Sequence, residues 1–200
     1  MWAPAALLTA LIAAVAVQAD TPVSHPRWPL GTTVGVWVDA RRAPPGSVEL
    51  TKRAVERWSE ALEGRVTLRV VATASAAQIR VAFVDATDNY GETYPHVNLR
   101  TGSIDRADVR IAAAVPGDGT TKAIVAYLTA LHELGHAIGL EHTLEFDDIM
   151  YTFHLPDDGA RYFARYRASI RSVDAIGTAS ASGLSPNDLR RLRQLYGGGR

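Results

Sequence analysis

Three histidines and one glutamate within residues 132–142 have the types and spacing of a catalytic zinc site. His132 and His136 are four residues apart, so on a helix they lie one turn above each other and can share a tetrahedral metal. Glu133 can then face the fourth coordination position, where water binds. His142 comes six residues after His136, and a continuous helix cannot bring it back to the metal. Gly139 allows the left-handed backbone that ends a helix and turns the chain.

The extended pattern is more specific than its first half. A bare His-Glu-x-x-His string also occurs by chance, and the alternative is a set of ordinary polar residues on a helix without a metal. The added glycine and third histidine favour the metal site. We therefore predict His132, His136 and His142 as zinc ligands, with Glu133 as a general base.

A methionine downstream of this motif strengthens the interpretation. Met150 lies eight residues beyond His142, and taken alone it is typical of a core filler. Beside the zinc motif, these residues resemble the metzincins, in which a methionine-containing turn follows the long zinc motif and lies under the metal. Thr143 is similar to the serine that the matrixin branch has at this position.

The resemblance implies a fold and an activity. The fold is α/β: a mostly parallel five-stranded sheet with an antiparallel edge strand, a backing helix, an active-site helix and a C-terminal helix. The activity is zinc-dependent hydrolysis of peptide bonds in an extended polypeptide. Glu133 would take a proton from the attacking water and pass it to the leaving amine.

The resemblance also implies that substrate pairs with an edge strand, which adds backbone hydrogen bonds without demanding sequence. The matching segment is residues 91–97, in which a proline fits an edge strand and the alternative is a simple loop. Further candidates follow the predicted Met-turn. The candidate substrate-binding residues are Thr93, Tyr94, Pro95, His96, Tyr151, Phe153 and His154.

His96 falls where many matrixins have a ligand of a second, structural zinc. Arg110 stands where another such ligand would be, and one ligand does not make a site. We expect one catalytic zinc and no structural zinc, with His96 a surface or cleft residue. The sequence assigns no calcium site.

Composition narrows the class of protein. The 200 residues carry 21 Lys and Arg against 21 Asp and Glu, and no basic footprint indicates nucleic-acid binding. The absence of cysteine excludes disulfides. We expect one catalytic domain over residues 31–200 and, because no coiled-coil pattern occurs, a monomer.

The N-terminal residues 1–19 are nearly all apolar and end in a small residue. This pattern predicts a signal peptide, followed by an extended leader over residues 20–30 and a secreted or periplasmic protein without a membrane partner. The segment has no Lys or Arg, so an uncleaved membrane anchor is the alternative, although the run is short for a bilayer span.

Hydrophobic periodicity predicts an alternation of strands and helices, which is typical of a sheet backed by helices. In the zinc helix, an apolar face leaves His132 and His136 on the other side. That face consists of Ile124, Tyr127, Leu131, Leu134 and Ile138. Strands are expected at residues 32–38, 66–72, 79–84, 92–97 and 109–115, a loop at 116–121, and helices capped by Ser47 and Ser185.

Residues 151–183 depart from the matrixin pattern by their length. Aromatic residues at helical spacing alternate there with arginines. One interpretation is an extra surface helix with a solvated basic face, and the other is a lid that shapes the pocket for the side chain after the scissile bond. The residues are Tyr162, Phe163, Tyr166 and Ile170, with Arg161, Arg165, Arg167 and Arg171.

Two other functions use the same residues. A non-catalytic binding domain would keep the fold but lose a ligand or the base, and none is damaged here. A zinc hydrolase of cell-wall peptide cross-links would need the same ligands, so the sequence does not separate it from an endopeptidase.

Overall fold

The computed structural model describes residues 25–85, 87 and 89–197. The predicted signal peptide and residues 20–24 of the predicted leader lie outside the described residues. Among the helices of the described part of the chain, none is both long and apolar enough to cross a membrane.

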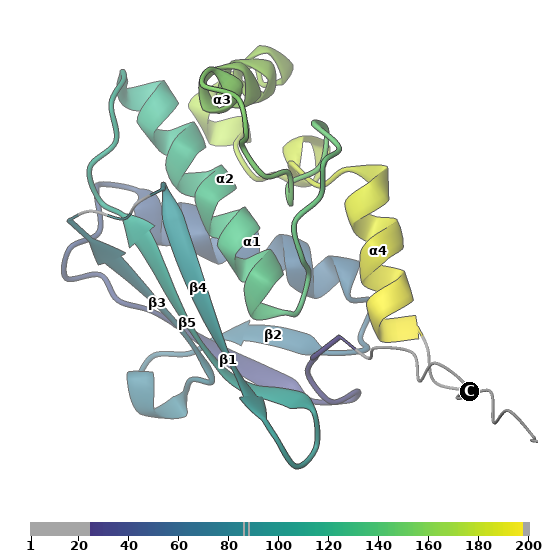
Figure 1. Cartoon of the computed structure of the whole chain (residues 1–200). Coiled ribbons are helices and arrows are strands. Elements are labelled where there is room, and N and C mark those ends of the chain that lie inside the picture. The colour runs from purple at the N-terminus through teal and green to yellow at the C-terminus, as the bar shows by residue number, and fades with distance from the viewer. Residues whose placement is uncertain (1–24, 86, 88, 198–200) are drawn as a thin grey trace, which may run out of the picture.

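In the part of the chain that the structure describes, one sheet of five strands has the order β2-β1-β3-β5-β4 (Figure 1). Neighbouring strands are parallel except β4, which lies antiparallel to β5 at one edge. This arrangement confirms the predicted mostly parallel sheet with an antiparallel edge strand. The strands are β1 (Thr33–Val38), β2 (Thr67–Val70), β3 (Ile79–Val84), β4 (Gly91–Asn98) and β5 (Ser103–Ala112).

The four α-helices found in the described residues lie on one side of the sheet (Figure 1). Helices α1 and α2 pack on each other, and the Trp58 indole of α1 donates a 2.7 Å hydrogen bond to the Leu131 carbonyl of α2. The helices are α1 (Ser47–Ala61), α2 (Gly119–Ala137), α3 (Asp158–Ser169) and α4 (Pro186–Gly197), and short 3-10 turns occur at Ala74–Ala76, Val173–Ala175 and Ala179–Ala181.

The apolar face predicted for the zinc helix is confirmed in α2. All five of its side chains are fully buried in the core shared with the sheet and α1. The opposite side of α2 remains partly open, and His132 and His136 project from it. Core packing therefore fixes the rotation of the helix that carries two candidate ligands.

The boundaries predicted for the fifth strand are wrong. The strand was expected at residues 109–115, but β5 spans Ser103–Ala112. Strand β5 contains a bulge: Arg106 pairs with His96 and Ile104 with Val97, so Asp105 is an extra, unpaired residue, and Ile104 and Ala107 are both buried although they are three residues apart. Because this alternation is interrupted and the outer face of the strand is charged, the sequence pattern did not indicate a strand over the first half of β5.

Two predicted helix starts are also shifted. Gly46, with a φ of 80°, is the N-cap of α1, so Ser47 is its first residue instead of its cap. Helix α2 begins within the predicted loop because the Asp118 side chain caps it by accepting a 2.7 Å hydrogen bond from the Thr121 amide. The Ser185 cap of α4 is confirmed: its hydroxyl accepts a 2.9 Å hydrogen bond from the Asp188 amide.

Candidate active site

The three predicted ligands converge at one point. The Nε2 atom of His142 lies 3.2 Å from that of His132 and 3.1 Å from that of His136. A tetrahedral zinc with bonds of about 2.0–2.1 Å needs ligand nitrogens about 3.3 Å apart, so the donor set fits this metal. Within the described residues, this is the one cluster of three or more His, Cys, Asp or Glu side chains arranged to hold a metal ion.

The other ring nitrogens fix the orientation of two ligands. His132 Nδ1 donates to the Ile149 carbonyl at 2.6 Å, and His136 Nδ1 donates to the Leu140 carbonyl at 2.8 Å. Because a carbonyl can only accept, both Nε2 atoms keep a lone pair toward the cluster. Burial lowers the pKa of His132 to about 3 and that of His136 to about 4, and it also lowers the pKa of His142. The imidazoles are therefore neutral, as metal binding requires.

The turn that returns His142 depends on Gly139. Its φ is +94°, in the left-handed region, and a Cβ there would lie 2.3 Å from the Pro26 carbonyl oxygen. Both the conformation and the close approach of residue 26 exclude a larger side chain. The sequence predicted the turn, whereas the contact with Pro26 could not be read from it.

Glu133 lies beside the cluster and is held by the edge strand. Its side chain is buried, and Oε2 accepts a 2.7 Å hydrogen bond from the Thr93 hydroxyl. Burial raises the pKa of Glu133 to about 7, and the hydrogen bond from Thr93 opposes that rise. Gly91 makes room for this contact, because a Cβ there would lie 2.8 Å from Glu133 Cγ and 2.7 Å from Thr129 Cγ2.

Met150, the residue predicted for the Met-turn, packs against helix α2. It is fully buried, and a Cβ on Gly135 of α2 would lie 2.4 Å from its sulfur and 3.2 Å from Trp58. The turn is closed by the Thr143 amide, which donates a 2.8 Å hydrogen bond to the Met150 carbonyl. The methionine thus packs directly against the turn of helix that carries the ligands.

Two buried carboxylates that sequence reasoning missed join this turn to α4. Asp148 accepts hydrogen bonds of 2.6 Å from both the Ser185 hydroxyl and the Asn187 amide. Asp188 accepts a 2.9 Å hydrogen bond from the Ile149 amide, and burial raises its pKa. Ser185 was interpreted only as the cap of α4, so the signal was present but was assigned to a local role.

A cleft of about 580 Å³ runs past the histidines and Glu133, along β4. Of the predicted substrate-binding residues, the structure brings four to this cleft and leaves three outside it. The alternation of a strand explains part of the division, because successive side chains of β4 point to opposite faces of the sheet. Thr93, Pro95, Tyr151 and Phe153 line the cleft, whereas Tyr94, His96 and His154 do not.

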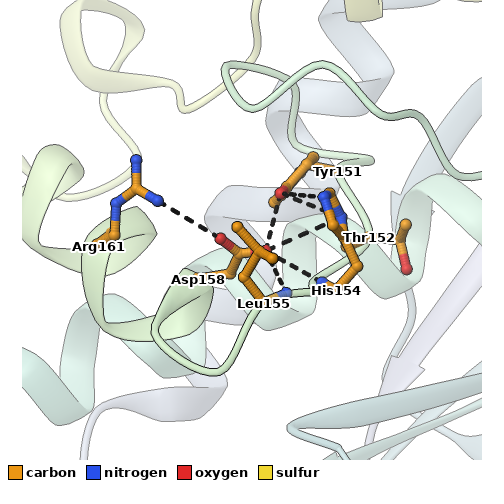
Figure 2. A network of polar contacts seen from close by, with 6 residues as sticks. All are labelled: Tyr151, Thr152, His154, Leu155, Asp158 and Arg161. Carbon is orange, nitrogen blue, oxygen red and sulfur yellow. Dashed lines mark hydrogen bonds and ion pairs between the residues drawn. The ribbon is translucent and has the colours of Figure 1, made fainter.

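The residues outside the cleft have other partners. The Tyr94 hydroxyl donates a 2.8 Å hydrogen bond to Glu92, and Nε2 of His96 lies 2.9 Å from a carboxylate oxygen of Asp108. His154 follows the Met-turn, and its Nδ1 lies 3.2 Å from the Tyr151 hydroxyl (Figure 2).

Helix α3 is the extra helix expected after the Met-turn. Its aromatic side chains are buried and its arginines lie at the surface, where two are paired with neighbouring elements. Arg167 makes two 3.0 Å hydrogen bonds to Asp118, the N-cap of α2, and Arg165 pairs with Asp147. The buried aromatic residues are Tyr162, Phe163 and Tyr166, of which the first two line the cleft.

A buried carboxylate at the start of α3 holds the segment that leaves the Met-turn (Figure 2). Oδ2 of Asp158 accepts hydrogen bonds from the Tyr151 hydroxyl at 2.8 Å and from the amides of His154 and Leu155 at 3.0 and 2.9 Å. Oδ1 has no hydrogen bond, and its ion pair with Arg161 is 3.8 Å long. One oxygen therefore organises the wall of the cleft.

The chain is similar to several known proteins. The family model described as matrixin matches residues 44–164, which include all three histidines, Glu133 and Met150. Matrilysin from Felis catus is 34% identical over 80 residues, a match that covers 40% of this chain and 23% of the length of that relative. The structure of myroilysin covers 87% of this chain and 97% of its own, with 17% identity and a TM-score of 0.48.

Proposed function

Because the chain belongs to the matrixin family, we propose that it is a zinc-dependent endopeptidase with Glu133 as its general base. The observation that carries this proposal is the convergence of three neutral, oriented imidazoles beside a buried carboxylate in an open cleft. A non-catalytic domain would not need the base, and here both ligands and base are intact. A protein-sized substrate fits into a long cleft better than it fits into a closed pocket.

Each residue has a separate role in the proposed reaction. His132, His136 and His142 hold one zinc through Nε2. When bound, zinc supplies Lewis acidity, which lowers the pKa of water and polarises the scissile carbonyl. Glu133 accepts the proton of the attacking water and delivers it to the leaving amine. Thr93 orients the carboxylate for both transfers.

The edge strand offers the place for an extended substrate. Among the strands of the described residues, β4 pairs with β5 alone, so its other edge offers backbone groups along the cleft. Thr93 and Pro95 face the cleft, and Pro95 provides a carbonyl but no amide hydrogen. A polypeptide bound here would add a strand to the sheet and pass its scissile bond over the histidines.

We also propose that the protein acts after export and as a monomer. The support is the apolar N-terminal pattern of residues 1–19 and the lack of a coiled-coil pattern. Expression of the whole chain with N-terminal sequencing of the exported product tests the first point: a start at Asp20 supports cleavage, and a cell-bound product that retains residues 1–19 supports a membrane anchor.

Turnover is tested with casein and with peptidoglycan fragments, each incubated with the zinc-loaded protein. We expect casein cleavage that a chelator abolishes, and Glu133→Gln should lower the rate by about 10² to 10⁴ without loss of zinc. Glu145→Gln, on an exposed loop outside the cleft, is the matched control and should retain the parent rate. Cleavage of peptidoglycan fragments alone would support the cell-wall hydrolase, and cleavage of neither substrate would support the binding domain.

A further inference from the structure

One buried positive charge on α4 has no role in the proposed mechanism. It belongs to Arg191, whose Nη1 atom is buried and has no hydrogen-bond partner in the part of the chain that the structure describes. No ion pair joins this guanidinium to a carboxylate of the described residues either. Because an arginine side chain stays protonated in proteins, a full charge remains there without a counter-charge in contact.

The spacing along α4 places Arg191 against the turn that returns the third ligand. Arg191 comes three residues after Asp188 and four before Leu195, so the three side chains share one face of the helix. Asp188 accepts a 2.9 Å hydrogen bond from the Ile149 amide, and a Cβ on Gly139 would lie 3.4 Å from Leu195 Cδ2. The helical face that carries Arg191 therefore packs on both ends of the segment between Gly139 and Ile149, which contains that ligand.

The charge of Arg191 acts on two of the three ligands. Burial is the main cause that lowers the pKa of His142, and the Arg191 charge is the second. After burial, the same charge also contributes to the low pKa of His136. Glu141 opposes it at His136, but the Glu141 side chain is 68% exposed and its carboxylate lies 3.1 Å from His25 Nδ1, so solvent and this pairing weaken its effect. The protein behind these two ligands therefore carries a net positive charge.

We propose that Arg191 tunes the metal centre as a fixed positive charge, which weakens zinc binding and strengthens the binding of an anionic group at the open coordination position. This inference rests on the zinc site of the proposed function. A positive charge near the ligands repels the metal cation, and the same charge attracts an anion that enters the site. Because the guanidinium is partly buried, salt screens both effects less than at the surface. During hydrolysis, the scissile carbonyl oxygen gains negative charge and would benefit in the same way.

Zinc affinity, measured by competition with a chromophoric chelator, tests the first effect. Arg191→Met removes the charge and keeps an unbranched side chain, so it should lower the Kd for zinc by about 3- to 10-fold. Arg191→Gln is a second neutral variant and should act in the same direction, whereas Arg191→Lys keeps the charge and should bind zinc as the parent does. Arg190→Met is the matched control, because Arg190 is exposed on the same helix, and it should leave the Kd unchanged. If Arg191 only packed α4 on the ligand turn, its loss would instead weaken zinc binding, and that result would overturn the inference.

Acetate, as an anionic probe, tests the second effect without turnover. Its binding to the protein loaded with cobalt(II) is followed by the visible absorption of that metal. The neutral variants should raise the Kd for acetate by about 2- to 5-fold, opposite in direction to the change for zinc, and Arg191→Lys should restore it. Opposite shifts of the two Kd values support the inference even if the parent protein cleaves no peptide. An unchanged Kd for either probe in the neutral variants, or shifts of both in the same direction, would overturn it even with a confirmed endopeptidase.

Discussion

The Thr93 hydroxyl donates a 2.7 Å hydrogen bond to Oε2 of Glu133, and it also lies 3.0 Å from the Glu133 carbonyl oxygen. This pair joins the edge strand to the ligand helix at the position where the proton transfers are proposed. Thr93 was predicted to bind substrate. It lines the cleft, but its hydroxyl is engaged by the glutamate, which makes it a positioning residue for Glu133 in our account.

Replacing Thr93 by valine keeps the shape of the side chain and removes the donor. A hydrogen bond to a charged group contributes about 1.5–3 kcal/mol, so we expect kcat to fall by about 10-fold or more with little change in KM and zinc content. Thr93→Ser should recover most of the lost rate because it restores the hydroxyl. A parent-like kcat for Thr93→Val would show that Thr93 does not position Glu133.

Gly91→Ala tests how closely β4 must approach α2. The added methyl would lie 2.7–2.9 Å from atoms of Thr129 and Glu133, so either the strand or the carboxylate must move. We expect a loss of about 1–3 kcal/mol in the free energy of unfolding and a lower kcat. Gly119→Ala meets no atom within 4 Å and serves as the control. Equal stability and kcat in the two variants would contradict the steric argument.

The clustering of the three histidines could be predicted from sequence because their spacing is local. His132 and His136 are one helical turn apart, and Gly139 marks the turn that brings His142 back. The apolar face of α2 and the alternation of apolar and polar residues in β3 are also local patterns. The first predicts which side of the helix faces the core, and the second predicts a strand. The family resemblance supplied the antiparallel edge strand, which no local pattern indicated.

Long-range contacts explain what the sequence did not show. The first half of β5 was missed because a bulge at Asp105, within β5 itself, disrupts its alternation. Asp148 is buried against Ser185 and Asn187, which lie 37 and 39 residues further along the chain. The fixed position of α3 likewise depends on Asp118, which lies 49 residues before its partner Arg167.

The Gly135–Met150 contact predicts non-additive substitutions. Gly135→Ala places a methyl 2.4 Å from the Met150 sulfur and should destabilise by about 1–3 kcal/mol. Met150→Ala leaves a cavity and should cost about 2–5 kcal/mol. In the double variant the new methyl occupies part of that cavity, so the loss should be smaller than the sum by about 0.5–3 kcal/mol. Urea unfolding of the zinc-loaded proteins measures the three values, and strict additivity would rule out direct packing.

Asp158→Ala should disorganise the cleft wall. It removes the acceptor of the Tyr151 hydroxyl and of two backbone amides, so we expect a lower Tm and a higher KM for peptides. Asp158→Asn should restore most of the KM, since a single oxygen accepts all three hydrogen bonds. Arg161→Ala should change little, because its ion pair is 3.8 Å long and the Arg161 side chain is exposed to solvent. A parent-like KM and Tm for Asp158→Ala would show that this carboxylate does not hold the wall.

The metal content of the purified, reconstituted protein tests the central claim most directly. We expect one zinc per chain in the parent and in His96→Ala, which changes a histidine outside the cluster, and a loss of stoichiometric zinc in His142→Ala. Zinc at a free concentration of 100 times Kd should also stabilise the parent protein by about 2.7 kcal/mol, which raises its Tm. A parent protein that takes up less than one zinc per chain, or a His142→Ala variant that binds zinc as the parent does, would contradict the account.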